Sequence, residues 1–346
     1  MTSLAARVFS PRIMPTNARL LTVGKIRTLL ARVPVDVHKA ALPCARMGSP
    51  GPAVPATHAS ARGLALRSNS PSGLSKHIAS TKRFNGTLIR TRPAASARRI
   101  ATGTATALQI ELVPCLSDNY SFLIHDPEAG ITAAVDPAEA KPFEDILEGR
   151  GLKLDYILNT HHHLDHVGGN EALKQKYGAT VVGPLADKDR IPGIDTALAD
   201  GDTFQLGGHT LTVYDTPGHT RGHIIYWCPS AEAVFVGDTL FALGCGRLFE
   251  GTPAQMFNSL AKIKALPGNT KVYCAHEYTQ SNARFCLSRP NTPPALLARA
   301  QEITQLRDSN IPTVPTTVQL ELDTNPFLMA ATVEEFAELR KAKDSF

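Results

Sequence analysis

The short segment 160–166 holds the residues best suited to chemistry, because it spaces histidine and aspartate side chains as His-x-His-x-Asp-His. Neutral imidazole and carboxylate groups are ligands that suit zinc and similar divalent metal ions. In an extended segment His161 and His163 point the same way, since side chains alternate with a period of two. Asp165 and His166 follow at the next bend, where they can serve a second ion. Four ligands are too few for two ions, so other parts of the chain must supply more.

Three later segments each place one histidine or aspartate just after a strand-like run. These residues are His219, Asp238 and His276. At such a junction a rigid sheet can present several side chains to one rim. Taken singly, each is more often an ordinary turn residue. Together, and in this order behind the first motif, they predict a site for two metal ions.

The rest of the sequence must provide the elements that hold these loops. Strands are expected at 108–114, 120–125, 131–136, 154–159, 179–182, 203–206, 210–214, 223–227, 233–236 and 271–274. Helices are expected at 138–149, 170–177, 252–265, 281–288, 294–309 and 332–343. Many strands are joined by short hairpin connections, which favours an α/β (α+β) fold with a mixed sheet sandwich flanked by helices over a doubly wound parallel sheet. Strand-like runs become scarce after residue 276, so 108–276 and 277–346 are expected to be separate domains.

Charge divides the chain into two unequal parts. Residues 1–107 carry 17 basic side chains and one acidic one, a net charge of +16, whereas residues 108–346 carry 19 basic and 30 acidic ones, a net charge of −11. An acid-poor segment rich in Arg, Ser, Ala and Pro is typical of a largely disordered targeting leader. It predicts a mitochondrial protein, with the plastid as the alternative. A nucleic-acid-binding tail is the competing interpretation, which the acidic body disfavours because it repels phosphate backbones.

Bulk composition argues against a membrane-spanning protein and against a disulfide-rich secreted protein. No apolar run approaches the ~20 residues of a membrane span. The six cysteines contain no Cys-x-x-Cys pair and follow no secretory signal, so a disulfide framework is not expected.

In these motifs the chain resembles the metallo-β-lactamase fold superfamily and, within it, the glyoxalase II (hydroxyacylglutathione hydrolase) family. The resemblance runs from about residue 109 to residue 346. Its most specific segments are THHHLDHVGGN (160–170), TPGHTRGH (216–223), GDTLFALGCGRLFEGT (237–252), YCAHEYT (273–279) and LRKAKDSF (339–346). It implies an αββα metallo-β-lactamase-like sandwich over 108–276 and a helical glutathione-binding domain over 277–346.

The resemblance also implies how the ligands divide between two divalent ions. One ion would be held by His161, His163 and His219, and the other by Asp165, His166 and His276. Asp238 would bridge them, because a shared carboxylate lowers the repulsion between two dications. Zinc is the default metal, and iron or manganese fit the same nitrogen and oxygen ligands.

The implied activity is hydrolysis of S-2-hydroxyacylglutathione thioesters. S-D-lactoylglutathione, the typical substrate, gives glutathione and D-lactate in methylglyoxal degradation. Hydroxide held between the metal ions attacks the thioester carbonyl, and a metal ion stabilises the oxyanion that forms. Asp165 and Asp238 are therefore the expected catalytic residues, and Asp165 is also expected to orient the nucleophilic water.

The family's substrate contacts fall on Arg247, Phe249, His276, Tyr278, Arg340 and Lys343. Arg340 and Lys343 lie three residues apart and share a helix face, and Arg can grip a carboxylate through two parallel hydrogen bonds. Phe249 stands where some family members have Tyr. Met329 follows Asn-Pro-Phe-Leu where Arg often does, so the glutathione contacts differ in detail.

The main alternative is a glutathione persulfide dioxygenase with a single iron ion. The helical tail and the GCGRLFEGT loop argue against it, and the same tail and the Asp238 pattern argue against a β-lactamase. A nuclease is disfavoured because the body is acidic and lacks interleaved aromatic and basic residues near the site. A metal-binding protein without activity is disfavoured because the ligand set is complete. The expected partner is a small-molecule glutathione thioester, bound by a monomer that needs neither nucleic acid nor a membrane.

Overall fold

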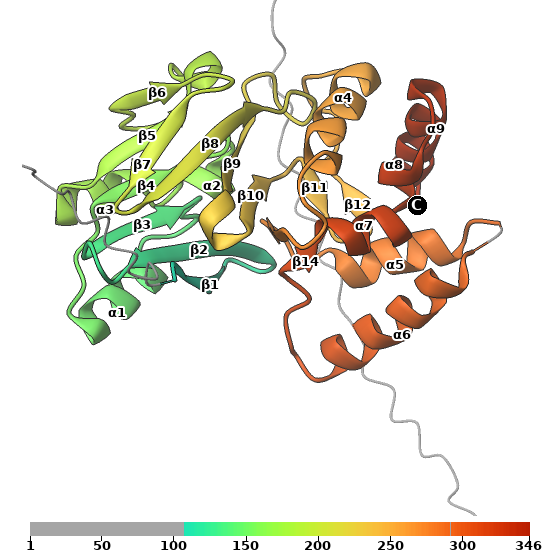
Figure 1. Ribbon diagram of the computed structural model, residues 1–346, viewed down its shortest axis with the longest axis horizontal. Helices are drawn as coiled ribbons and strands as arrows, with labels where there is room; N and C mark the ends of the chain where they lie inside the picture. Colours follow the sequence, from blue (N-terminus) through green and yellow to red (C-terminus); the bar gives the residue numbers. More distant parts are fainter. Residues whose placement is uncertain (1–106, 291) are drawn as a thin grey trace, which may run out of the picture. The chain divides into compact units, whose positions relative to one another are not determined.

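The computed structural model describes residues 107–290 and 292–346, so the predicted leader lies, except for Ala107, outside the described part. Two six-stranded sheets form the centre of this part (Figure 1). The first sheet has the order β1 (Gln109–Cys115), β2 (Asn119–Asp126), β3 (Ile131–Val135), β4 (Tyr156–Leu158), β5 (Thr180–Pro184) and β6 (Thr196–Leu198). Its first three strands are antiparallel, and β3 to β6 run parallel to one another.

The second sheet has the strand order β14, β13, β10, β9, β8, β7. These strands are β7 (Thr203–Leu206), β8 (His209–Asp215), β9 (Ile224–Cys228), β10 (Ala233–Gly237), β13 (Lys271–Cys274) and β14 (Thr316–Thr317). The β10–β13 pair is parallel and the other pairs are antiparallel. The chain therefore has the mixed sheets that the short connections predict.

Apolar side chains join the layers. Phe122 of β2 contacts Phe235 of β10 and Tyr273 of β13, with ring centroids 5.7 and 5.2 Å apart, so aromatic pairs link the two sheets. Helices α1 (Lys141–Arg150) and α3 (Asn170–Tyr177) share a second buried cluster with strands of the first sheet and cover its outer face. This arrangement confirms the predicted sandwich flanked by helices.

Helix α4 (Pro253–Lys264) shows how local sequence sets an element. Thr252 forms a capping box with Gln255, and Pro253 occupies the first turn, where its missing N–H costs nothing. Met256, Leu260 and Ile263 recur at helical spacing and are buried in the larger core. The sequence predicted a helix over 252–265, with Pro253 in a favourable first-turn position.

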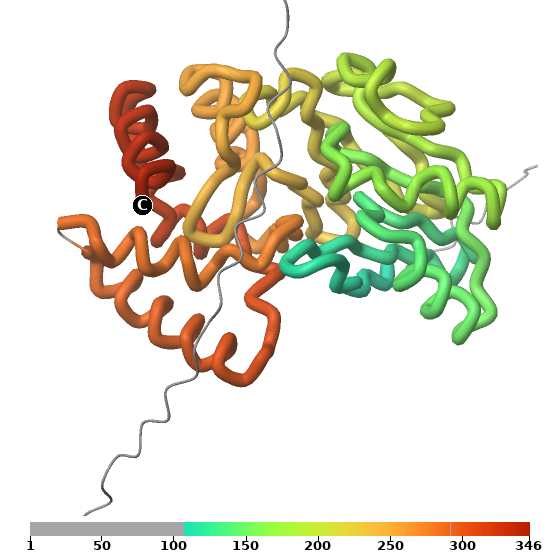
Figure 2. Tube along the Cα trace, turned by 180° about the vertical axis from the view of Figure 1, so that it is seen from behind, coloured from blue at the N-terminus to red at the C-terminus, as the bar shows by residue number. Residues whose placement is uncertain are grey.

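The C-terminal helices gather on one side of the sandwich, as Figures 1 and 2 show from opposite directions. They are α5 (Thr279–Leu287), α6 (Pro294–Asp308), α7 (Val318–Thr324), α8 (Pro326–Met329) and α9 (Val333–Asp344). Between them β14 pairs with β13, so this mainly helical tail also extends the second sheet. No helix within residues 107–290 and 292–346 combines the length and apolarity needed to cross a bilayer.

Two of the differences from the sequence-based expectation concern where a helix begins. The segment after His163 is not a bend but the one-turn helix α2 (Leu164–Val167), with His163 at its N-cap. The helix expected from residue 138 begins at Lys141, where Pro142 fits the first turn. Both differences concern turns that hydrophobic periodicity does not encode.

Candidate active site

The loops that follow β4, β8, β10 and β13 bring together all seven predicted metal ligands. These are His161, His163, Asp165, His166, His219, Asp238 and His276. Three sets of three residues have ligand atoms within 4.8 Å of one another, and two of them correspond to the two expected ions: His161, His163 and His219, and Asp165, His166 and His276. The third set joins His161 and His166 to Asp136. The ends of four separate strands thus converge on one centre.

The first group consists of three imidazoles. His163 Nδ1 lies 3.0 Å from His219 Nε2, and the His161 ring lies 4.7 Å from that of His163. Burial lowers the pKa of all three, that of His163 to about 4, and for His161 and His163 the neighbouring imidazoles add to the effect. The three rings are therefore neutral at neutral pH, which is the form that binds metal ions.

The second group combines imidazoles with carboxylates. Asp165 Oδ2 lies 3.6 Å from His166 Nε2 and 3.5 Å from His276 Nε2. Burial lowers the pKa of His276, but the charge of Asp238, with further contributions from Asp165, more than offsets this and raises it to about 9. The carboxylates thus draw positive charge to this group, and a dication would replace the proton.

Asp238 lies between the two groups. Its Oδ1 is 3.4 Å from both His166 Nε2 and His276 Nε2, and its Oδ2 is 3.3 Å from His219 Nε2. Burial alone would raise the pKa of Asp238, but the charges of the surrounding histidines hold it well below its usual range. Each of its oxygens faces a different group, as the sequence-based assignment of a bridging carboxylate requires.

Unpaired buried atoms fit a metal centre. His161 Nε2, His166 Nε2 and Asp238 Oδ1 are buried, and none has a hydrogen-bond partner within the described residues. Buried polar atoms in proteins are normally hydrogen-bonded, so three orphans facing one centre require a reason. Divalent cations would satisfy all three, because each atom offers a lone pair.

Carboxylates and amides outside the ligand set hold the second group in place. Asp136 Oδ2 accepts from His166 Nδ1 at 3.1 Å, and Asp118 Oδ1 accepts from His276 Nδ1 at 2.9 Å. Asn119 Nδ2 donates to Asp165 Oδ2 at 3.1 Å. Such partners fix the ring orientation and raise the basicity of the ligand nitrogen. The sequence analysis did not assign these roles, although Asp118 lies in the segment PCLSDNY (114–120) and Asp136 in VDP (135–137), both of which also match the family.

Two further histidines of the motifs have supporting positions. His162 points away from the ligand group, as strand alternation predicts, and its Nδ1 lies 2.9 Å from Asp187 Oδ2. His223 stacks on His161 with ring centroids 4.7 Å apart. Its Nε2 accepts from the backbone N–H of Asp238 at 3.1 Å, so it fixes the bridging residue through its main chain.

Close backbone approaches at two glycines shape the Asp238 loop. Gly237 has φ 47°, which turns the chain at the end of β10, and a side chain there would meet Thr160. A Cβ at Gly246 would lie 2.0 Å from the Asp238 carbonyl oxygen and 3.2 Å from His219 Nδ1. The contact at Gly246 is with backbone, which cannot rotate away.

Gly246→Ala is therefore expected to displace Asp238, with a loss of unfolding free energy of about 1–3 kcal/mol and a lower metal content. Urea unfolding and metal analysis measure the two effects. Gly149→Ala is the matched control, because Gly149 lies in α1 with open space around its Cβ position. It should leave the metal content unchanged and raise stability by about 0.5–1 kcal/mol. Equal behaviour of the two variants would contradict the close approach.

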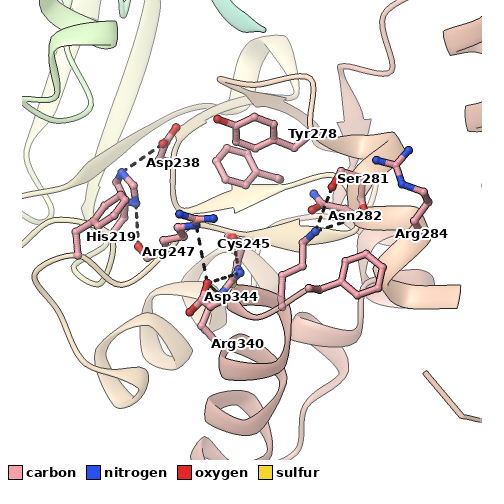
Figure 3. A pocket seen from close by; sticks show the side chains of 14 residues that line it. His219, Asp238, Cys245, Arg247, Tyr278, Ser281, Asn282, Arg284, Arg340 and Asp344 are labelled. Atoms are coloured by element: carbon pink, nitrogen blue, oxygen red, sulfur yellow. Dashed lines mark hydrogen bonds and ion pairs between the residues drawn. The ribbon is translucent and has the colours of Figure 1, made fainter. Parts of the chain in front are cut away.

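A cavity of about 620 Å³ opens beside the ligand centre. Figure 3 shows His219 and Asp238 at one end, Ser281 and Arg284 at the other, and Tyr278 between them. The predicted substrate contacts other than His276 all line it: Arg247, Phe249, Tyr278, Arg340 and Lys343. Sequence reasoning did not single out Phe241, Ser281, Asn282, Arg284 or Asp344, which line it as well.

The cationic side chains of this cavity differ in how far they are exposed and in whether protein groups already pair with them. Arg340 is buried; its Nη1 donates to the Cys245 carbonyl at 2.8 Å and its Nη2 donates to Asp344 at 2.8 Å. Arg247 is 65% exposed, and its Nε lies 3.9 Å from Asp344. Lys343 Nζ lies 3.3 Å from Ser281 Oγ. Arg247 and Lys343 can thus reach a bound anion directly, whereas Arg340 already has protein partners.

Two curated relatives match this chain over nearly the whole of their own length. Hydroxyacylglutathione hydrolase of Brucella anthropi is 52% identical over 256 residues, covering 70% of this chain and 98% of that protein. Hydroxyacylglutathione hydrolase of Brucella ovis is 53% identical over 253 residues, covering 69% and 98%. The chain belongs to the hydroxyacylglutathione hydrolase family.

Family models and solved structures place this hydroxyacylglutathione hydrolase family member in a wider group. The metallo-beta-lactamase superfamily matches residues 120–276, and the hydroxyacylglutathione hydrolase C-terminus matches 277–346. ETHE1 from Myxococcus xanthus is similar at 25% identity with a TM-score of 0.53, covering 68% of this chain and 90% of that one. A metallo-beta-lactamase from Staphylococcus aureus shares the fold, with 19% identity, a TM-score of 0.51 and coverage of 69% and 73%. The superfamily fold and the His/Asp groups suit divalent metal ions.

Proposed function

We propose that this chain hydrolyses S-2-hydroxyacylglutathione thioesters, S-D-lactoylglutathione among them, to glutathione and a 2-hydroxy acid. The observation that carries the proposal is a single cavity with the metal-ligand centre at one end and two cations, Arg284 and the Lys343 beside Ser281, at the other. A glutathione thioester has its reacting carbonyl and its carboxylates at separate points. It therefore matches a site whose metal ligands and cations are also separated.

We propose further that two divalent ions bind, one in each ligand group, with Asp238 between them. Zinc is the default, since imidazole and carboxylate ligands suit it, and iron or manganese are the alternatives. When bound, the ions would lower the pKa of a coordinated water to about 7 and polarise the thioester carbonyl. The orphaned atoms of His161, His166 and Asp238 support this proposal.

The chain's own residues would orient the reaction. Asp165 is held by Asn119 Nδ2, which leaves its carboxylate directed at the centre, where it can align the attacking water. Tyr278 stacks on His276, with ring centroids 4.6 Å apart and planes at 6°, and forms a wall of the cavity beside the reacting carbon. Glutathione thiolate is a good leaving group, so no covalent protein intermediate is needed.

Cations would hold the glutathione moiety, which carries two carboxylates and one ammonium group. Arg247 and Lys343 are the side chains with freedom to contact them, and Arg284 adds positive charge at the far end of the cavity. Arg340 would act mainly by fixing the loop of Cys245 through its carbonyl. Lys343 lies beside Ser281, at the end of the cavity away from His219 and Asp238, so it is expected to act on binding more than on chemistry.

Lys343→Ala is accordingly expected to raise KM for S-D-lactoylglutathione by about tenfold with little change in kcat, because a charge-assisted hydrogen bond is worth about 1.5–3 kcal/mol. Steady-state kinetics measure both constants. Lys341→Ala is the matched control, since Lys341 is exposed on the same helix and does not line the cavity. A tenfold fall in kcat at unchanged KM would contradict a role in binding.

The direct test of the function measures thiol release from S-D-lactoylglutathione by the zinc-loaded chain, together with the number of bound ions. Rapid thiol release with two ions per chain is the expected result. The alternative, a glutathione persulfide dioxygenase with one iron ion, predicts instead oxygen uptake with glutathione persulfide and no hydrolysis under anaerobic conditions.

The cellular setting is a separate proposal. The basic, acid-poor composition of residues 1–107 supports delivery to the mitochondrion, with the plastid as the alternative. We propose a monomer that acts on a small molecule in methylglyoxal degradation and needs neither nucleic acid nor a membrane. Fluorescent fusions with and without residues 1–107 test the targeting.

A further inference from the structure

A cluster of one histidine and three charged side chains lies next to the first ligand group and takes no part in the proposed chemistry. It consists of His162, Asp187, Arg190 and Glu250, which come from three separate segments of the chain. The Asp187 side chain is fully buried, and it accepts from His162 Nδ1 and from Arg190. A buried carboxylate is costly unless it is paired, so this arrangement needs an explanation.

Arg190 is the centre of the cluster. It pairs with Glu250 through both terminal nitrogens and with Asp187 through Nη2, and its Nη1 lies 3.2 Å from His162 Nε2. The hydrogen bond from Arg190 lowers the pKa of Glu250 to about 2. One neutral tautomer of His162 satisfies every contact, because it donates from Nδ1 to Asp187 and accepts at Nε2 from Arg190.

The cluster fixes the loop that carries His219. Glu250 Oε2 accepts from the backbone N–H of Arg221 at 2.9 Å. Gly222 is pressed against Asp187, since a Cβ there would lie 2.1 Å from Asp187 Oδ1. Both contacts fall within three residues of His219, so they set where its ring lies.

The same cluster also fixes the loop after Asp238. Phe249, the neighbour of Glu250, packs its ring 5.7 Å from that of His163 and 5.2 Å from that of His219. The Arg247 carbonyl accepts from His219 Nδ1 at 2.9 Å. His162 meanwhile anchors the backbone between His161 and His163, so all three ligands of the first group depend on these charges.

The two ligand groups differ in their support. Asp136 and Asp118 contact His166 and His276 of the second group directly. In the first group, within the described residues, the non-ligating nitrogens have no such carboxylate: His161 Nδ1 has Thr160 Oγ1 and His219 has a carbonyl. The imidazole rings of the first group must therefore be oriented by the loops that carry these histidines.

We infer that Arg190, together with Asp187 and Glu250, positions His163 and His219 and thereby sets how tightly the first metal ion is held. These are positioning residues, because none of them reaches the substrate cavity. The inference rests on the proposed two-metal function. It predicts that this cluster affects the affinity for the ion in the first ligand group and not for the ion in the second.

The test uses the full chain loaded with two zinc ions and measures the release of each ion to a coloured chelator. Arg190→Ala is expected to speed release of one ion about tenfold and to leave the other unchanged, since supporting residues typically affect metal affinity by about 10–100-fold. The release rate of Arg190→Lys should lie between those of the wild type and Arg190→Ala, because an ammonium group cannot grip two carboxylates as a guanidinium does. In Arg190→Ala kcat should fall while KM for the thioester is maintained.

Arg221→Ala is the matched control, because this 74% exposed side chain lies 3.7 Å from the same Glu250 but outside the cluster. It should release both ions at the wild-type rates. The inference would be overturned if Arg190→Ala released both ions at the wild-type rates, or if it released both ions faster by the same factor.

Thermal melting shows whether Arg190→Ala folds. If it does not fold, the release rates of the two ions from Arg190→Lys decide between the same outcomes. Failure of the proposed function is distinct, since the wild type would then bind fewer than two ions or release no thiol.

Discussion

Asp238→Asn is expected to lose bound metal and to lower kcat for the thioester by about 10³-fold or more, because in the proposed site both ions would share this carboxylate. The substitution keeps the size of the side chain but removes its negative charge. Asp238 Oδ1 lies 3.4 Å from the Nε2 atoms of His166 and His276, and Oδ2 lies 3.3 Å from His219 Nε2. An amide would turn a nitrogen towards one group, so at least one ion would lose a ligand and the repulsion between the two would rise.

Metal analysis and steady-state kinetics on the same preparation measure this result. Asp118→Asn is the graded comparison: His276 is the predicted ligand that the Asp118 carboxylate contacts, so the substitution should weaken metal binding by about 10–100-fold. Asp145→Asn on the exposed face of α1 is the control and should change neither quantity. An Asp238→Asn protein that keeps two ions and the wild-type rate would refute the shared-carboxylate site.

Local sequence was sufficient to predict several elements with their bounds. The strand 203–206 and the helix 170–177 were predicted with the bounds of β7 and α3, because hydrophobic runs and turn residues define them. β14 (Thr316–Thr317) was not predicted. It has two residues, and its strand conformation depends on pairing with β13, which lies more than forty residues earlier. Such short strands carry no periodicity of their own.

The same distinction applies to the site. The ligands were predictable because each lies in a motif with a recognisable neighbourhood, as His161 and His163 do. The inferred positioning residues were not predictable in this way: Asp187 lies in a segment that looks like an ordinary turn, and Glu250 lies in the GCGRLFEGT loop, where nothing in the sequence singled out its side chain. Arg340 is a similar case: its spacing indicated the helix face, but its hydrogen bond to the Cys245 carbonyl joins positions 95 residues apart. Only the folded chain reveals such long-range contacts.

One buried ion pair connects the helical tail to the substrate cavity. Glu321 of α7 is fully buried and pairs with Arg299 of α6, and its other oxygen accepts from the backbone N–H of Leu243 at 2.9 Å. Leu243 has φ 59° and lies in the turn between β11 (Leu240–Phe241) and β12 (Gly244–Cys245). That hairpin separates Asp238 from Arg247 in the chain, so Glu321 supports the segment that joins the metal centre to the glutathione contacts.

Glu321→Ala is therefore expected to lower the free energy of unfolding by about 3–5 kcal/mol, because it leaves Arg299 buried without its counter-charge. It also removes the acceptor for Leu243, so KM for the thioester should rise as the hairpin loosens. Urea unfolding gives the stability change, and steady-state kinetics below the transition give KM. Glu148→Ala is the contrast, since Glu148 pairs with Lys176 on the surface and such pairs contribute about 0–1 kcal/mol.

A double substitution separates the charge effect from simple loss of packing. Arg299→Met combined with Glu321→Leu removes both buried charges while keeping apolar volume, so it should be less destabilised than Glu321→Ala alone. Recovery should be incomplete, because Asn325 Nδ2 and Thr316 Oγ1 also donate to the Glu321 carboxylate, at 2.9 and 2.6 Å, and would lose their acceptor. If the double variant were as unstable as the single one, the unpaired charge of Arg299 would not be the cause, and lost hydrogen bonds would account for the whole effect.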